Sequence, residues 1–223
     1  MSKFYVADDP TLFAEVARVL GPDRLAGYLT DSGGDTGRSL RLYAWNAALA
    51  SAFLPAIGVV EVALRNAIHE RLTIHFGIDW FDDAAFLAID SVPFTSHIAR
   101  AKRHIATGGK VITPPRIVAQ LMFGFWVALL RPTYARSVWP ILRPAFPPYT
   151  RRRRIADALD PLVVFRNRIA HHEVIYDRQP RAMYERLKVG AGLLSPRLDE
   201  WVEHHARVSQ LLASGPVRSS NTF

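Results

Sequence analysis

Apolar residues recur every three to four positions along most of this 223-residue chain, with polar residues between them. A spacing near 3.6 residues is typical of helices that bury one face, whereas half-buried strands alternate at every second residue. No stretch of the sequence shows that alternation. The pattern therefore predicts an all-α protein. The expected helices cover residues 10–20, 23–29, 39–76, 80–89, 96–106, 114–130, 151–159, 161–170, 181–189 and 195–213.

Prolines and glycines punctuate these helices. Pro55 is expected to break or restart the long helix over residues 39–76, and Asp160 is expected to cap a new helix whose first residue is Pro161. Residues 132–150 hold five prolines and four aromatic side chains, which indicates a stiff connecting segment. We favour packing of these rings into the core over stacking on RNA bases.

The chain length suits one buried domain, residues 1–223. Residues 1–37 would form an N-terminal helical extension of this domain, and residues 214–223 a frayed tail. The absence of cysteine excludes disulfides and thiolate metal sites, and residues 1–10 lack the basic-then-apolar pattern of a signal peptide. These features predict a cytoplasmic protein.

Residues 42–60 test the membrane interpretation, because they are uncharged and nearly long enough to span a bilayer. Asn46, Pro55 and Gly58 interrupt this stretch, many of its residues are alanine, and Glu61 follows it directly. A buried core helix is therefore favoured over a transmembrane helix. No association with a membrane is expected.

Positive charge is concentrated in the middle third of the chain. Residues 91–156 carry 12 lysines and arginines and no aspartate or glutamate, while the whole chain has a net charge of +8. A basic block of this kind attracts polyanions and makes their binding salt-dependent. We expect RNA as the partner, bound by Arg151, Arg152, Arg153 and Arg154. The alternative is a solvated basic surface without a ligand.

The most informative stretch is Arg-Asn-Arg-Ile-Ala-His-His-Glu, residues 166–173, which follows an apolar helical run. Arginine can hold a phosphate through paired, charge-assisted hydrogen bonds, and histidine can transfer a proton near neutral pH. Asparagine adds a neutral donor and acceptor. These are the groups needed to break an RNA strand, which makes Arg166, Asn167 and His171 the candidate catalytic residues.

Spacing decides how such a site can be built. Asn167 and His171 are four residues apart and lie on one helix face, whereas Arg166 and His171 are five apart and diverge by roughly 140°. One straight helix therefore cannot aim both Arg166 and His171 at one phosphate. Either the helix ends near Ala170 so that His171 folds back, or a second subunit completes the site across a two-fold axis. We favour both together, which predicts a homodimer.

The motif resembles the R-x4-6-H signature of the HEPN superfamily, and its extended form RNRIAHHE resembles the Abi-like (AbiD/AbiF-type) abortive-infection branch. Glu61 to Asn66 also resembles a polar stripe on an early helix of that branch, and Phe123 to Trp126 resembles its mid-chain Phe-Gly-x-Trp segment. The resemblance covers roughly residues 38–190. It implies an all-α, HEPN-like helical bundle, a dimer with facing motifs and metal-independent cleavage of RNA.

Glu61, Arg65 and His69 lie at positions i, i+4 and i+8 and form one polar stripe on an apolar helix. In one interpretation Glu61 pairs with Arg65, and His69 is a core histidine with satisfied hydrogen bonds. In the other, Glu61 orients Arg166 or His171, and Arg65 adds a phosphate contact. Glu61 and Arg65 are therefore candidate supporting residues under the second interpretation, and both interpretations stay open.

His172 and Glu173 are further supporting candidates, which would tune the site. The run His171-His172-Glu173 does not suit a metal ion, because three consecutive side chains point in different directions. Glu200 and His204 are four residues apart, but a solvated helix face explains them better. We expect neither a metal nor a cofactor.

These observations favour a metal-independent endoribonuclease that leaves 2′,3′-cyclic phosphate and 5′-OH ends. It would act in antiphage abortive infection or as a toxin-like effector, with a regulatory RNA or an antitoxin as a further partner. The main alternative is a catalytically inactive HEPN-like module that binds RNA or a protein. A metal-dependent hydrolase is a weaker alternative.

Overall fold

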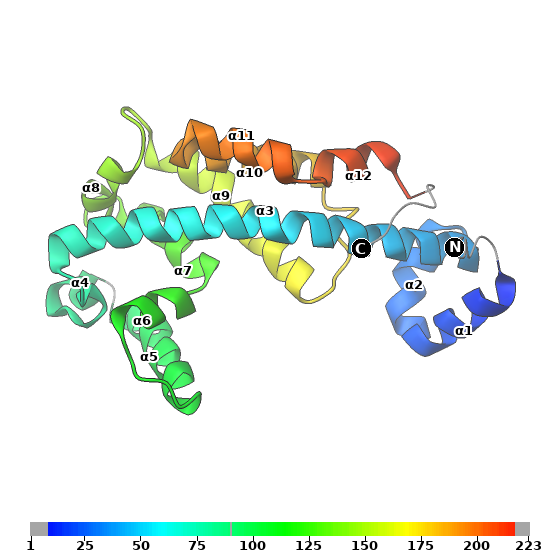
Figure 1. The fold of residues 1–223 in the computed structure, drawn as a ribbon, viewed down its shortest axis with the longest axis horizontal. Helices are drawn as coiled ribbons and strands as arrows, with labels where there is room; N and C mark the ends of the chain where they lie inside the picture. Colours follow the sequence, from blue (N-terminus) through cyan, green and yellow to red (C-terminus); the bar gives the residue numbers. More distant parts are fainter. Residues whose placement is uncertain (1–8, 90, 217–223) are drawn as a thin grey trace, which may run out of the picture. The chain divides into compact units, whose positions relative to one another are not determined.

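The computed structural model describes residues 9–89 and 91–216. Every regular element in this part of the chain is helical, which confirms the all-α class (Figure 1). Most of the tail predicted for residues 214–223 lies outside the described residues. The α-helices are α1 (Pro10–Leu20), α2 (Pro22–Asp31), α3 (Thr36–Phe76), α4 (Ala84–Ile89), α5 (Ser91–Thr107), α6 (Pro114–Gln120), α7 (Phe123–Ala128), α8 (Trp139–Leu142), α9 (Arg152–Ala170), α10 (Pro180–Leu194), α11 (Pro196–His205) and α12 (Val208–Ser214). Three short 3-10 helices cover Trp80–Asp82, Pro132–Tyr134 and Arg143–Ala145.

The chain divides into two compact units. The first consists of residues 1–55, 167–184 and 206–223, and the second of residues 56–166 and 185–205. The divisions at residues 55, 166 and 184 fall inside α3, α9 and α10. The single domain expected for the whole chain stays a prediction.

The predicted N-terminal extension forms α1 and α2 of the first unit. α1 begins where expected because the Asp9 carboxylate accepts hydrogen bonds from the N–H groups of Thr11 at 2.9 Å and Leu12 at 3.2 Å. In α2, Tyr28 is buried, and its ring meets the ring of Tyr43 in α3 with centroids 5.2 Å apart. The extension thus contributes to the core of its unit.

α3 runs for 41 residues without interruption, so the break or restart expected at Pro55 is wrong. Pro55 has no N–H, and the carbonyl of Ser51 therefore lacks its usual helical partner. Both residues are exposed, so water can bond to that carbonyl and the helix can continue.

One face of α3 is buried along its length. Leu49 and Phe53 are fully buried in the first unit, and Ile57, Val60 and Leu64 in the second. Within the described residues, α3 is the one helix long and apolar enough to cross a membrane, and 44% of its most apolar window is buried. Length and composition do not separate a membrane span from a core helix, so the absence of a membrane stays a prediction.

Three helices expected to be continuous are divided, and the one predicted for residues 80–89 becomes the 3-10 helix Trp80–Asp82 followed by α4. The helix predicted for residues 114–130 becomes α6 and α7, because Leu121 leaves the helical conformation with ψ 117°. The Leu121 carbonyl accepts a hydrogen bond from Nε1 of Trp126 at 2.9 Å, a buried contact that fixes the turn. The helix predicted for residues 195–213 becomes α11 and α12, which are separated at Ala206 and Arg207.

The second unit has an aromatic core that includes rings from the proline-rich segment. Tyr134 packs against Phe94 with centroids 5.1 Å apart, and Trp139 packs against Phe146 at 5.7 Å. Packing of these rings into the core was predicted from the sequence. Tyr149 is the exception, because its side chain is 91% exposed.

α9 runs unbroken through Pro161, so the new helix expected to start there with Asp160 as its cap is wrong. Pro161 cannot donate a hydrogen bond to the carbonyl of Asp157. That carbonyl instead accepts a hydrogen bond from Nη1 of Arg186 in α10 at 2.5 Å. The guanidinium of Arg186 thus replaces the missing N–H as the donor to this carbonyl, and α9 continues past the proline.

We predict that Arg186→Met lowers the free energy of unfolding by about 1 kcal/mol, because it leaves the Asp157 carbonyl without its donor. In a Pro161→Ala background the backbone N–H at position 161 can bond to the same carbonyl, so the loss should nearly vanish. Urea unfolding of the four proteins in this double-mutant cycle measures the difference. Arg197→Met is the matched control, and an equal loss in both backgrounds would contradict the prediction.

Candidate functional site

The candidate motif lies at the end of α9, which stops at Ala170 as predicted. The N–H of His172 bonds to the carbonyl of Ile169 at 3.0 Å, and the N–H of Glu173 bonds to the carbonyl of Arg168 at 2.9 Å. This pair of bonds closes a helix in the Schellman motif. His172 has φ 55°, in the left-handed region that favours glycine. The chain therefore places a β-carbon where most helices of this kind use glycine.

His171 keeps the helical register at the end of α9. Its N–H bonds to the carbonyl of Asn167 at 3.0 Å, so the folding back expected for His171 is wrong. Asn167 and His171 lie on one helix face, as their spacing predicts, and both side chains are exposed. The division between the two units falls between Arg166 and Asn167, so Arg166 belongs to the second unit.

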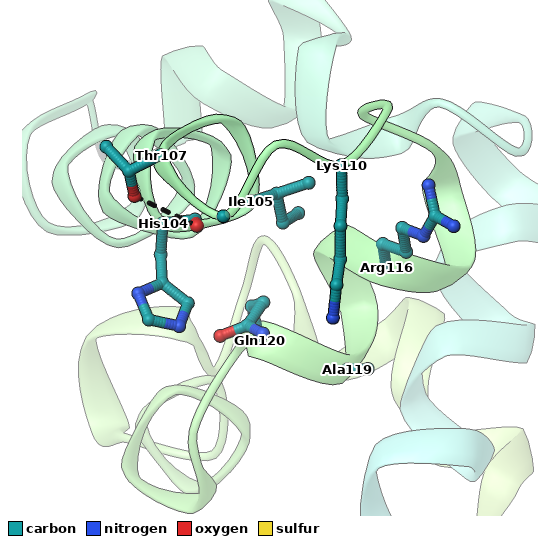
Figure 2. A pocket seen from close by; sticks show the side chains of 8 residues that line it. His104, Ile105, Thr107, Lys110, Arg116, Ala119 and Gln120 are labelled. Atoms are coloured by element: carbon teal, nitrogen blue, oxygen red, sulfur yellow. Dashed lines mark hydrogen bonds between the residues drawn. The ribbon is translucent and has the colours of Figure 1, made fainter.

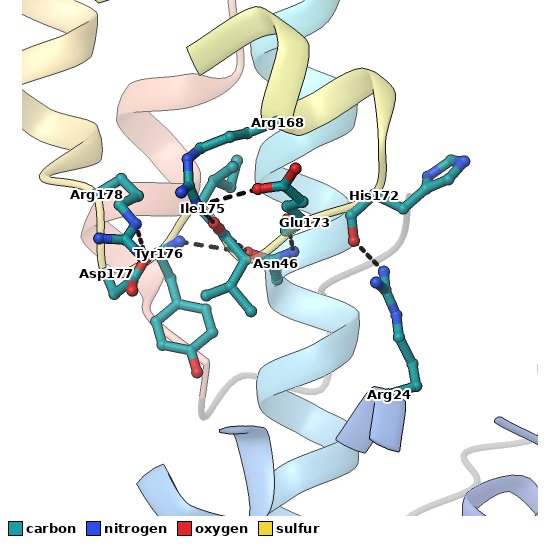
Figure 3. Close-up of polar contacts among 10 residues, drawn as sticks. Arg24, Asn46, Arg168, His172, Glu173, Ile175, Tyr176, Asp177 and Arg178 are labelled. Carbon is teal, nitrogen blue, oxygen red and sulfur yellow. Dashed lines mark hydrogen bonds and ion pairs between the residues drawn. The ribbon is translucent and has the colours of Figure 1, made fainter. Parts of the chain in front are cut away.

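Arg168 closes the helix end with its side chain. Its Nη1 lies 3.2 Å from Oε2 of Glu173 and 3.5 Å from the carbonyl oxygen of Val174. Figure 3 shows Arg168 and Glu173 pointing toward each other, whereas the imidazole of His172 points away from them. The Glu173 carboxylate thus has a structural partner. The tuning roles expected for His172 and Glu173 stay predictions.

Asn46 of α3 fixes the loop that follows α9 (Figure 3). Its Nδ2 donates to the carbonyl of Glu173 at 3.2 Å, and its Oδ1 accepts from the N–H groups of Ile175 at 2.8 Å and Tyr176 at 3.3 Å. Asn46 is only 5% exposed. Sequence reasoning treated Asn46 as an interruption of an apolar stretch. The sequence did contain a signal for this role, because an amide buried in an apolar helix must find hydrogen-bond partners.

α2 holds the same loop with two further contacts that the sequence did not indicate. Arg24 donates to the carbonyl of His172, and the Tyr176 hydroxyl donates to Oδ2 of Asp31 at 2.6 Å. Burial and the neighbouring Asp31 carboxylate raise the pKa of Tyr176 above its usual value, so the hydroxyl keeps its proton. His172 therefore begins a loop that is tied to α2 and α3, directly after His171.

Glu61, Arg65 and Arg166 come together in the second unit. Glu61 is half-buried, and burial raises the pKa of its carboxyl above the usual value. The positive charge of Arg166, a hydrogen bond from the Phe123 backbone and the charge of Arg65 oppose that rise, in this order of size. This is the arrangement expected if Glu61 orients Arg166. The roles of all three residues in a reaction stay predictions.

Close packing of α7 on α9 positions the Phe-Gly-x-Trp segment beside this group. A β-carbon on Gly124 would lie 3.4 Å from Cγ1 of Val163, at the limit of ordinary contact. Gly124 therefore marks where α7 lies against α9, next to the Phe123 backbone that bonds to Glu61.

His69 is a structural residue, as one interpretation of the polar stripe held. Nε1 of Trp80 donates to its Nδ1 at 2.9 Å, and the hydroxyl of Thr73 lies 3.4 Å from the same nitrogen. Burial and the positive charge of Arg65 lower the pKa of His69. A neutral imidazole with a buried donor is suited to packing, not to proton transfer.

The four consecutive arginines have different surroundings. Arg152 is half-buried and donates a hydrogen bond to the carbonyl of Leu130, so it has a structural contact. Nε of Arg153 lies 3.4 Å from Oδ2 of Asp157, and its side chain is 85% exposed. Arg151 and Arg154 are also exposed. Three of the four expected RNA-binding arginines therefore reach solvent.

No group of three or more His, Asp or Glu side chains in the described residues is arranged to hold a metal ion. Comparisons with known protein families, characterised proteins and solved structures give no match for this chain. The Abi-like HEPN assignment therefore rests on the motif and its two supporting segments.

We predict that Arg166→Gln raises the pKa of Glu61 further, because it removes the charge that most opposes the effect of burial. NMR titration of the Glu61 carboxyl measures the change, and Arg153→Gln is a control that should leave it unaltered. A carboxyl whose pKa is raised in the folded state makes its full contribution to stability at pH values below its unfolded-state pKa. This contribution is lost as the pH rises through the folded-state pKa. Arg166→Gln should therefore shift that loss of stability to higher pH. An unchanged Glu61 titration would contradict an effect of the Arg166 charge on this carboxyl.

We also predict that His172→Gly raises the free energy of unfolding by up to about 1 kcal/mol, because glycine adopts a positive φ without steric cost. His171→Gly is the matched control and should lower stability by about 0.5–1 kcal/mol, because His171 keeps the helical register. Thermal or urea unfolding checks both changes. If both substitutions lower the free energy of unfolding, the His172 side chain makes a contact that stabilises the protein by more than the positive φ of His172 destabilises it.

Proposed function

We propose that this protein is a metal-independent endoribonuclease of the Abi-like HEPN type, acting as a homodimer. One observation carries the proposal: Arg166 lies near the half-buried carboxylate of Glu61, and the same helix ends in the exposed pair Asn167 and His171. A carboxylate that orients an arginine, followed by an accessible histidine, supplies charge stabilisation and proton transfer. The acid-free segment over residues 91–156 supports RNA as the substrate.

In the proposed reaction the ribose 2′-oxygen attacks the adjacent phosphorus while the bond from phosphorus to the 5′-oxygen breaks. His171 moves the proton that leaves the 2′-hydroxyl, and the departing 5′-oxygen is protonated. Arg166 stabilises the charge that develops on the phosphate oxygens. Asn167 positions His171 or the substrate from the same helix face. The products are a 2′,3′-cyclic phosphate and a 5′-OH end, with no metal or cofactor required.

The proposed setting is the cytoplasm, in antiphage abortive infection or as a toxin-like effector. A regulatory RNA or an antitoxin would hold the activity in check. The exposed arginines Arg151, Arg153 and Arg154 are suited to contact the RNA backbone. Facing motifs of two subunits would bring Arg166 of one chain toward His171 of the other.

The test is cleavage of RNA by the purified protein in EDTA, with end-group analysis of the products. His171→Ala and Arg166→Ala should each lower the rate by about 100-fold or more, and the double variant should be scarcely slower than either, because residues that act as a unit are not additive. His204→Ala and Arg197→Ala, both on α11, are matched controls that should retain the rate. Activity that needs a divalent ion, or that survives the motif changes, would overturn the mechanism.

Subunit mixing tests whether a dimer builds the site. If each site takes Arg166 from one chain and His171 from the other, a mixed dimer of the two single variants has one intact site. Random exchange should then restore about a quarter of the wild-type rate. A monomer that cleaves RNA at micromolar concentration would contradict the shared site.

A catalytically inactive module that binds RNA is the second candidate. The observation that favours it is that Arg168 and Glu173 of the motif form a structural ion pair at the helix end. Under this alternative the purified protein binds RNA without cleaving it, and His171→Ala leaves binding unchanged. The cleavage assay in EDTA therefore separates the two candidates.

A further inference from the structure

A pocket of about 520 Å³ lies in the second unit, where α5 ends and α6 follows. Its lining combines polar and basic side chains with the apolar Ile105 and Ala119. Figure 2 shows its side chains, which include His104, Ile105, Thr107, Lys110, Arg116 and Gln120. None of these residues belongs to the motif of α9 or to the run of four arginines.

A glycine turn builds one wall of the pocket. The N–H of Gly109 bonds to the carbonyl of Ala106 at 3.0 Å, and the N–H of Lys110 bonds to the carbonyl of Ile105 at 3.1 Å. Gly109 has φ 66°, so this is again the Schellman closure of a helix, here with glycine at the left-handed position. The turn sends the chain back past the end of α5 and places Lys110 beside the pocket.

Arg116 fixes the other wall. Its Nη1 donates to the carbonyl of Val111 at 2.7 Å, which ties the loop after the turn to α6. The guanidinium has five N–H groups, and this bond uses one of them. The contact thus orients a cation beside the pocket without consuming its capacity to bind a ligand.

The pocket has an excess of donors over acceptors. Lys110 and Arg116 are cations, and His104 and Gln120 add an imidazole and an amide. In Figure 2 the side chains of Lys110 and His104 extend in the same direction, whereas the guanidinium of Arg116 points the other way. No carboxylate lines the pocket, and none occurs anywhere in residues 91–156. An anion would therefore meet charge-assisted hydrogen bonds from several directions without a competing negative charge.

The shape and chemistry of the lining indicate which anion fits. A volume of about 520 Å³ exceeds what one phosphate needs and falls in the range of pockets that bind small molecules. The lining has no Phe, Tyr or Trp, and the imidazole of His104 is its one aromatic ring. A nucleobase would thus have little ring surface to stack on, whereas a phosphate would meet several donors. The lining suits the ribose-phosphate part of a nucleotide.

We propose that this pocket is a phosphate-binding subsite for one nucleotide of an RNA strand, which it holds by the backbone without regard to sequence. The choice of RNA rests on the proposed function, whereas the preference for a phosphate ester rests on the pocket alone. Lys110 and Arg116 contact the phosphate, and His104 and Gln120 donate to its remaining oxygens or to the ribose. This subsite positions the strand at a place distinct from the candidate catalytic residues.

Fluorescence anisotropy with single-stranded RNA tests the subsite. Lys110→Ala and Arg116→Gln should each weaken binding by about 10-fold, equally for oligonucleotides of different sequence, and should reduce the salt slope by about one. Arg103→Gln is the matched control, because Arg103 is exposed on α5 in the same basic segment but does not line the pocket. It should weaken binding less than about threefold through the general field alone. Equal effects of all three changes would overturn the proposal.

Competition identifies the source of the phosphate. A mononucleotide and inorganic phosphate should each displace RNA less effectively from the Lys110→Ala protein than from the wild type, and amide NMR shifts on titration should cluster over residues 104–120. Shifts that cluster elsewhere would overturn the proposal. A mononucleotide that binds more tightly than an oligonucleotide would also overturn it, in favour of a free nucleotide as the ligand. Because Arg116 has a structural bond, thermal unfolding of its variant checks the fold, and the exposed Lys110 provides the independent result.

Cleavage is measured separately, so the two proposals can fail independently. The Arg103→Gln protein should cleave at the wild-type rate, whereas the Lys110→Ala protein should need a higher RNA concentration to reach half of its maximal rate. If RNA binding depends on Lys110 but no cleavage occurs, the endoribonuclease proposal is wrong and the subsite proposal stands. If cleavage occurs but Lys110→Ala leaves RNA binding unchanged, the subsite proposal is wrong and the endoribonuclease proposal stands.

Discussion

A single buried amide determines the course of the chain after α9. Asn46 satisfies one carbonyl and two N–H groups of the segment from Glu173 to Tyr176, because its amide carries both a donor and an acceptor. Leaving those backbone groups without partners would cost more than the bonds themselves contribute. The amide thus defines one path for the loop. The left-handed conformation of His172 and the closure of α9 follow from that path.

The second unit uses a carboxylate in a comparable way. The Glu61 carboxylate accepts a hydrogen bond from the Phe123 backbone at the start of α7 and lies near the positive charge of Arg166. Burial opposes this arrangement, because it raises the free energy of the ionised carboxylate. Two polar residues of one long helix, Asn46 and Glu61, thus lie near residues of the motif, Asn46 in the first unit and Glu61 in the second.

Local patterns in the sequence predicted the helical class, the end of α9 and the shared face of Asn167 and His171, because these depend on periodicity and on residues a few positions apart. They failed where the deciding partner is remote. The amide of Asn46 bonds to a carbonyl 127 residues away, which no spacing rule reveals. The sequence predicts a helix start at Pro161, because proline is common at the first position of helices.

Compensation from another helix explains that failure, since the donor for the Asp157 carbonyl comes from Arg186, 29 residues along the chain. Whether Glu61 orients Arg166 was left open by the sequence, because it depends on how remote helices pack, and it stays a prediction. The binding pocket at the end of α5 could not be foreseen, because its lining comes from two helices and the turn between them. Charge counting predicted only the acid-free segment that contains it.

The passage of α9 through Pro161 has a consequence for the newly made chain. The ribosome adds the motif well before Arg186, so an emerging polypeptide contains the whole motif sequence before it contains the side chain that supports the helix at the proline. A truncated product that ends before Arg186 has the same defect. The helix that carries the motif therefore lacks one of its stabilising contacts until the chain has been synthesised beyond Arg186.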